Sequence, residues 1–76
     1  MKNYEIQIMV LGSVNGESAN VWSARGTISG RSIPAMLKRA YYRCFSGNFQ
    51  SHPQRENVLM HNRYHEVPVL RLVEVA

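Results

Sequence analysis

The stretch SIPAMLKRAYYRCFSG, residues 32–47, decides the layout of the chain because it carries a complete set of helix signals. The hydroxyl of Ser32 can accept from first-turn amides, and Pro34 fits the first turn, where amides lack intrahelical partners. The apolar residues recur at helical spacing and are Ile33, Met36, Leu37, Ala40, Tyr41 and Cys44. Gly47 suits the left-handed position that ends a helix. The sequence therefore predicts a helix over Ser32–Ser46, with its apolar stripe packed on a sheet.

Two strands are predicted before this helix. Apolar residues alternate with others from Tyr4 to Val10, and again over about Trp22–Ser29, where Trp22, Ala24 and Ile28 form the apolar set; this places Trp22 in the core. Asn15-Gly16 between the strands is typical of a two-residue hairpin turn. That turn would pair Val10 with Val21, Ile8 with Ser23 and Ile6 with Arg25. The polar Ser23 and Arg25 would then lie on the same face of the sheet as the apolar residues of the first strand. We therefore expect a longer or bulged connection, about Gly12–Asn20, with Asn15-Gly16 at its tip.

Two further strands are predicted after the helix. A short one covers about Glu56–Met60, and a tight connection through His61–Tyr64 leads into a long one over Glu66–Val75. The final strand is apolar on both faces for part of its length, which suits a central strand or an intersubunit contact in a homodimer. The expected fold is α+β, in the order ββαββ: an antiparallel sheet of about four strands with one helix packed on a face, in a single domain over residues 1–76.

The composition excludes several classes of protein. Cys44 is the sole cysteine, so a disulfide within the chain is ruled out, in keeping with a reducing compartment. No apolar run approaches the length of a membrane span, and the first residues lead into a strand pattern rather than a signal peptide. We therefore expect a cytoplasmic protein without a membrane partner. All five acids are glutamates that lie far apart, which makes a carboxylate pair for catalysis or metal binding hard to assemble.

The chain has a net charge of +4, and the excess of basic residues is concentrated in one part of the sequence. Between Glu17 and Glu56 the chain has no acid, and the basic residues in this window are Arg25, Arg31, Lys38, Arg39, Arg43 and Arg55. Helical spacing places Lys38, Arg39, Tyr42 and Arg43 on the side opposite the apolar stripe. Such a face can bind phosphates or carboxylates, and a tyrosine on it can stack on a base. A solvated helix face is the alternative explanation of the same pattern.

Other candidate sites have less support. His61 and His65, with His52 or Cys44, contain zinc-ligand types but lack the dense spacing of a zinc motif. The same histidines with Arg63 and Tyr64 could form a small ribonuclease site, but no nucleophile motif, phosphate loop or carboxylate pair accompanies them. We therefore expect no metal, no cofactor and no catalytic residue.

Phe49 lies in a polar loop and is either an exposed anchor for a partner or folded back onto the helix end. The predicted partner-binding set combines this aromatic residue with the basic window and comprises Arg25, Arg31, Lys38, Arg39, Tyr42, Arg43, Phe49 and Arg55.

In its size, single-domain build and lack of catalytic groups, the whole chain resembles the small inhibitors carried by bacteriophages and mobile elements, anti-CRISPR proteins among them. This resemblance implies a non-enzymatic protein that docks on a nucleic-acid-handling complex of its host. Many such inhibitors are acidic mimics of nucleic acid, whereas this chain is basic and would instead meet acidic protein patches or bound nucleic acid. The alternative is a direct RNA- or DNA-binding module that uses the same arginine-rich helix.

Overall fold

The computed structural model describes residues 1–51, 54–61 and 67–75. In chain order the elements are β1 (Lys2–Val14), β2 (Glu17–Gly30), α1 (Ile33–Cys44), β3 (Gln50–Ser51), β4 (Val58–Met60) and β5 (Pro68–Val75). The α+β class, the antiparallel sheet and the helix are confirmed. The predicted four strands and ββαββ order are wrong in detail, because the two-residue strand β3 pairs with β4 and makes the order ββαβββ. So short a strand carries no alternation that a sequence pattern could reveal.

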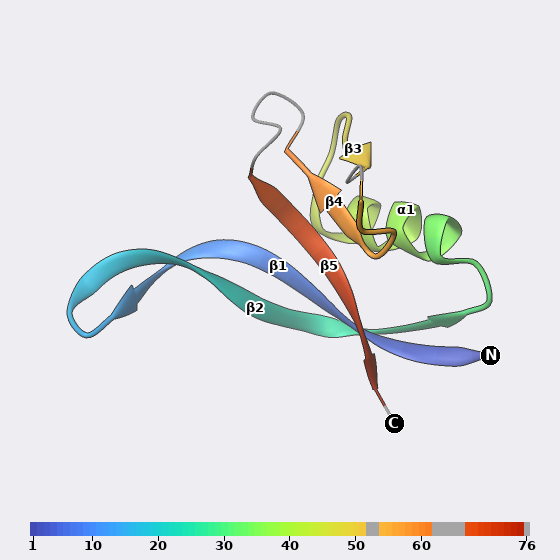
Figure 1. Cartoon of the computed structure of the whole chain (residues 1–76), viewed down its shortest axis with the longest axis horizontal. Helices are drawn as coiled ribbons and strands as arrows, with labels where there is room; N and C mark the ends of the chain where they lie inside the picture. Colours follow the sequence, from blue (N-terminus) through green and yellow to red (C-terminus); the bar gives the residue numbers. More distant parts are fainter. Residues whose placement is uncertain (52–53, 62–66, 76) are drawn as a thin grey trace.

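The five strands form one sheet in the order β2-β1-β5-β4-β3, with α1 on one face. In Figure 1, β1 and β2 form a long twisted hairpin whose far end projects away from the helix and from β4. The pairing of β1 with β5 covers only the first part of β1, from Asn3 to Ile8. The hairpin beyond Ile8 therefore extends past the three-strand part of the sheet as a two-stranded arm.

The hairpin turn has two residues, so the predicted longer connection over Gly12–Asn20 is wrong. Val14 pairs directly with Glu17, and the turn residues Asn15 and Gly16 have φ values of 53° and 82°. Two positive φ values mark a type I′ turn, whose twist matches that of the flanking strands. Val10 does pair with Val21 and Ile8 with Ser23. The bulge that corrects the register lies further along β2, beyond the turn.

That bulge is centred on Arg25 and Gly26. Gln7 pairs with Ala24 and Glu5 pairs with Thr27, so two residues of β2 lie opposite a single residue of β1. Gly26 has a φ of 89°, a left-handed conformation that suits glycine in a bulge. The extra residue reverses the alternation of β2 and brings Ile28 onto the face of the sheet that α1 covers.

The same reversal corrects the prediction for Trp22. Before the bulge, Trp22 pairs with Met9 and Ala24 pairs with Gln7, and both positions of β1 face away from the helix. Trp22 is half-buried and does not belong to the core cluster. Its prediction as a core residue failed because it assumed one unbroken alternation from Trp22 to Ile28.

Helix α1 begins as the sequence predicts. The Ser32 Oγ accepts from the amide of Ala35 at 3.4 Å, and the amide of Met36 donates to the Ser32 carbonyl at 3.0 Å. The helix ends at Cys44, two residues before the predicted end, because Phe45 is extended while its amide still donates to the Tyr41 carbonyl. Gly47 has a φ of 90°, but it lies beyond this cap, so its predicted role in stopping the helix is wrong.

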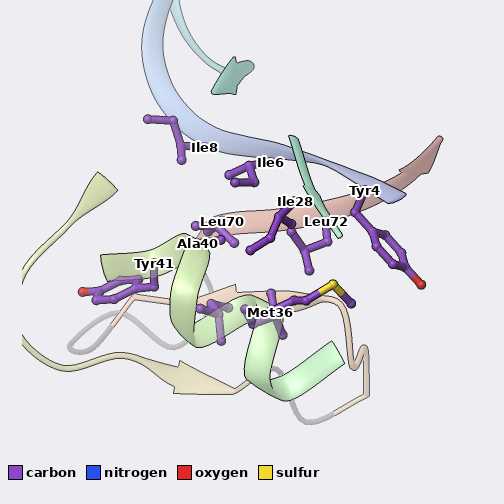
Figure 2. Close-up of a cluster of buried hydrophobic side chains, with 11 residues drawn as sticks. Tyr4, Ile6, Ile8, Ile28, Met36, Ala40, Tyr41, Leu70 and Leu72 are labelled. Carbon is purple, nitrogen blue, oxygen red and sulfur yellow. The ribbon is translucent and has the colours of Figure 1, made fainter. Parts of the chain in front are cut away.

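The core lies between α1 and the sheet, and Figure 2 shows its side chains. The predicted stripe is confirmed: Met36, Leu37, Ala40 and Tyr41 are buried, and Ile33 and Cys44 are partly buried against them. The sheet contributes Tyr4, Ile6, Ile8, Ile28, Leu59, Leu70 and Leu72. Helix and sheet meet closely where β2 ends, since a Cβ on Gly30 would lie 2.9 Å from Met36 Cγ and Sδ.

The last strands follow the predicted order with shorter bounds. Strand β5 lies between β1 and β4, which confirms its interpretation as a central strand, with Leu70 and Leu72 in the core. Its edges are occupied in part within the chain: β1 pairs with residues 70–75 on one side, and β4 pairs with Pro68, Leu70 and Arg71 on the other. The predicted homodimer stays a prediction. The predicted connection through His61–Tyr64 and the predicted start of the strand at Glu66 lie largely outside the described residues.

Candidate binding surface

Lys38, Arg39, Tyr42 and Arg43 lie on the side of α1 that faces away from the sheet, and we call them the basic helix face. All four side chains are exposed, and Tyr42 has 52% of its surface open to solvent. Their position follows from the stripe on the opposite side, because residues of a 3.6-residue helix that do not face the core face solvent. The sequence therefore placed these four residues correctly on an exposed face.

The charges of this face have no acidic neighbours on the helix. The first turn of α1 contains no acid, and within the described residues the one ion pair joins Lys2 to Glu74 at 3.7 Å, outside the helix. Arg43 is partly engaged, since its Nη1 donates to the carbonyl of Thr27 at 3.2 Å. Lys38 and Arg39 are exposed cations whose heads are open to a partner.

Arg25 extends the basic surface from the helix onto β2. Its guanidinium donates to the Ser23 hydroxyl and to the Ala24 carbonyl at 3.0 Å. Ser23 pairs with the core residue Ile8, so this contact lies on the side of the sheet that carries α1. Arg43 binds β2 at Thr27, two residues beyond Arg25, and the two arginines therefore belong to one side of the molecule.

A hollow of about 390 Å³ lies on the other flank of the helix. Three predicted site residues line it: Lys38, Phe49 and Arg55. The floor is largely apolar, from Pro34, Leu37 and Leu59, and Glu56 lies at the rim beside the two cations. The structure thus brings Lys38, near the middle of the acid-free window, close to Arg55 at its end, although 17 positions separate the two residues in the sequence. Arg31 is exposed just before the helix and does not line this hollow.

Phe49 is folded back onto the helix end, which was one of its two predicted placements. Its ring lies 4.8 Å from that of Tyr41 and 6.1 Å from that of Tyr42, and the side chain is half-buried against the core. The Tyr41 hydroxyl donates to the carbonyl of Asn48 at 3.0 Å, which holds the loop in this position. Phe49 therefore supports Tyr42 from behind rather than projecting as an anchor.

The opposite face of the sheet carries a polar strip that the sequence interpretation missed. Arg71 Nε donates to Gln7 Oε1 at 2.6 Å, and Gln7 Nε2 donates to Glu5 Oε1 at 2.9 Å. The guanidinium of Arg71 also lies over the ring of Trp22, 4.3 Å from its centroid. An alternation of Glu5 and Gln7 with core isoleucines was the available signal. Because the Arg71 guanidinium is held by Gln7 and by the ring of Trp22, this strip has a structural role.

Part of the zinc and ribonuclease hypotheses lies outside the described residues, since His52, Arg63, Tyr64 and His65 are not among them. Among residues 1–51, 54–61 and 67–75, no group of three or more metal-ligating side chains gathers in one place. Within those same ranges, no helix has both the length and the apolar character that a membrane crossing requires.

Comparisons of the chain with protein-family models, with curated proteins and with solved structures find no match.

Proposed function

We propose that this chain is a non-enzymatic binding protein that contacts an anionic macromolecular partner through the basic helix face. The observation that carries the proposal is the exposure of Lys38, Arg39 and Arg43 on one helix side that has no carboxylate of its own. Charges held close together without internal neutralisation raise the local positive potential and favour association with a surface of opposite charge.

The shape of this surface supports a groove or concave patch as the partner. A helix lying on a sheet presents a convex ridge, and Tyr42 on that ridge is half exposed and backed by Phe49. Aromatic and arginine side chains dominate the energy of many protein interfaces. We favour a small inhibitor of the anti-CRISPR type that docks on a nucleic-acid-handling complex of its host, where acidic protein patches and bound nucleic acid lie side by side.

Direct binding of RNA or DNA is the second candidate, and the position of Tyr42 favours it. Tyr42 follows Lys38 by one helical turn and precedes Arg43 directly in the sequence, so a base could stack on its ring while neighbouring phosphates meet the cations. Both candidates use the same residues. They differ in whether the partner that binds in isolation is a protein or a nucleic acid.

The test replaces the three cations of the face by glutamine and compares the result with a control of equal net charge. Lys38→Gln, Arg39→Gln and Arg43→Gln together lower the formal charge by three, from +4 to +1. Ser18→Glu, Asn20→Glu and Ala24→Glu also lower it by three, at exposed positions of β2 on the face opposite α1. The partner is first captured from host lysate with the wild-type chain and identified by mass spectrometry.

The glutamine variant is expected to bind the captured partner about tenfold more weakly or worse, since a loss of about 1.4 kcal/mol over three contacts gives that factor. The control variant is expected to bind within about twofold of wild type, because it leaves the contact residues unchanged. If both variants bind the partner equally weakly, net charge alone explains the loss of affinity, and the proposal is overturned. Circular dichroism confirms that both variants are folded.

Salt dependence separates the two candidates. If the three cations neutralise three phosphates of single-stranded RNA, the logarithm of the association constant should fall with the logarithm of the salt concentration with a slope of about −2. The glutamine variant should show little of this salt dependence. An inhibitor that docks on protein should show no binding to such RNA alone and should remain bound to its complex after nuclease treatment. Tight RNA binding with this slope would make the direct nucleic-acid module the function.

A further inference from the structure

The hollow on the flank of α1 is built from segments far apart in the sequence. Its helix wall consists of Pro34, Leu37 and Lys38, whose spacing of three and four residues places them on one side of the helix. Across from this wall, Ser51 of β3 pairs with Leu59 of β4, and paired residues of antiparallel strands share a face of the sheet. Leu59 belongs to the core cluster, so that face is the one α1 covers. The hollow therefore lies between α1 and the edge of the sheet that β3 forms.

The apolar part of the hollow suits an apolar group. Leu37 and Leu59 are buried and Phe49 is half-buried, and all three line it. Their side chains offer no hydrogen-bond donor or acceptor, so a polar group placed against them would lose its bonds to water without replacement. The volume of about 390 Å³ is near the lower end of the range for small-molecule sites. A site of this size and character fits one apolar side chain better than a large cofactor.

The polar side chains that line the hollow carry a net positive charge. Lys38 and Arg55 contribute two cations, Glu56 contributes one carboxylate, and Ser51 contributes a neutral hydroxyl. An incoming carboxylate would therefore meet two attractive neighbours and one repulsive neighbour. Lys38 also belongs to the basic helix face, so the hollow adjoins the surface that we propose as the contact with the partner. Charge complementarity favours an occupant with a negative group beside its apolar group.

We propose that the hollow receives an apolar side chain, about the size of leucine, from a segment of the protein partner that carries a carboxylate next to it. This inference rests on the proposed function, because it gives the chemistry of the partner that the basic helix face contacts. Burial of the apolar side chain supplies affinity, and the carboxylate near Lys38 and Arg55 sets the orientation of the segment. A nucleobase fits less well, since donors and acceptors on its edges would face Leu37, Phe49 and Leu59.

Small probes test this chemistry without the partner. Amide spectra of the labelled chain are recorded during titration with N-acetyl-leucine, with its neutral amide, with N-acetyl-glycine and with adenosine monophosphate. N-acetyl-leucine is expected to shift the amides of Leu37, Ser51 and Leu59 with a dissociation constant of about 1 mM, in keeping with its few non-hydrogen atoms. The neutral amide lacks the charge and N-acetyl-glycine lacks the apolar group, so each should bind at least about twofold more weakly.

The nucleotide provides the contrast with a nucleic-acid partner, and it should leave the amides of Leu37, Ser51 and Leu59 in place. If these amides do not respond to N-acetyl-leucine at about 10 mM, the inference is overturned, since that concentration would nearly fill a site of the expected affinity. It is equally overturned if adenosine monophosphate shifts them and N-acetyl-leucine does not.

Single substitutions at exposed positions have opposite expected signs. Arg55→Gln removes a cation of the hollow and should weaken binding of N-acetyl-leucine about twofold to fivefold, the effect of one exposed ion pair. Glu56→Gln removes the competing carboxylate and should strengthen binding by a similar factor. Arg31→Gln is the matched control, because it removes the same charge at an exposed position that does not line the hollow. Equal affinities of all three variants would contradict the proposed charge complementarity.

A variant that fills the hollow tests whether the partner uses it. Ser51→Tyr places a ring at the exposed residue of β3 that lines the hollow, and Ser18→Tyr places the same ring on the opposite face of the sheet. Ser51→Tyr should lose N-acetyl-leucine binding and should bind the captured partner about fivefold more weakly or worse, while Ser18→Tyr should match wild type. Circular dichroism confirms that both variants are folded.

The outcomes separate this inference from the proposed function. If Ser51→Tyr loses N-acetyl-leucine binding yet binds the partner as tightly as Ser18→Tyr, the inference is overturned and the proposed function stands. If the glutamine variant of Lys38, Arg39 and Arg43 binds the partner as tightly as wild type, the proposed function is overturned instead. The titrations with N-acetyl-leucine still decide the chemistry of the hollow in that case.

Discussion

Two leucines on this chain have opposite environments, and the difference sets what each contributes. Leu37 is 4% exposed and belongs to the core between helix and sheet, whereas Leu11 is 75% exposed on the hairpin arm. Burying a leucine side chain stabilises a fold by about 1.5–3 kcal/mol relative to leaving it in water. Leu37 is therefore expected to be important for folding, whereas Leu11 is expected to contribute little to the stability of the fold.

Leu37→Ala should lower the free energy of unfolding by about 2–5 kcal/mol, the range for leucine truncation in a packed core. In a domain of this size such a loss is a large part of the total stability. Urea denaturation followed by circular dichroism measures it. The same substitution at the exposed position 11 is the control, and it should change stability by no more than about 0.5 kcal/mol. Similar effects at the two positions would show that Leu37 is not a core residue.

At the scale of elements, the helix could be predicted closely because its signals are local. The Ser32 cap, Pro34 and the apolar stripe all act within a few residues of where they stand, and the stripe is buried as expected. The helix end was less predictable, because Phe45 leaves the helix while stacking on Tyr41 at 5.2 Å, a contact that follows from tertiary packing.

The second strand could not be predicted from its own pattern. A two-residue turn at Asn15-Gly16 conflicts with a single alternation running through Trp22 and Ile28, so the sequence favours a longer connection with Asn15-Gly16 at its tip. The structure has the two-residue turn, and the bulge at Gly26 breaks the alternation into two parts, so that Ile28 faces the core and Trp22 does not. A bulge reverses which face of the sheet each residue beyond it occupies. Because the pattern does not reveal the extra residue, it predicts Trp22 on the wrong face of the sheet.

The partners of the basic helix face are likewise beyond prediction from a single chain.

Gly26 should be sensitive to substitution through its backbone alone. A Cβ at this position meets no atom within 4 Å, so alanine creates no clash and its cost comes from the φ of 89°. Gly26→Ala should destabilise by about 1–2 kcal/mol, and Gly26→Asn by clearly less, because asparagine tolerates left-handed conformations. Thermal unfolding of the two variants side by side makes the comparison. An alanine variant as stable as the asparagine variant would argue against a left-handed bulge residue.

At the scale of the whole molecule, the two faces of the sheet differ in what they offer a partner. The helix side carries the exposed Lys38, Arg39 and Arg43, while Arg71 on the other side is held by Gln7 and Trp22. Exposed positive charge is therefore concentrated on the helix side.

The central claim is that the basic helix face is the contact surface, and a nuclear magnetic resonance footprint tests it most directly. Amide spectra of the labelled chain are recorded with and without the captured partner. The account predicts that changes concentrate on residues 38–43 and on Arg25, while the side-chain signal of Trp22, the sole tryptophan, stays in place. Changes concentrated on Trp22, Gln7 and Arg71, with the helix signals unchanged, would contradict it.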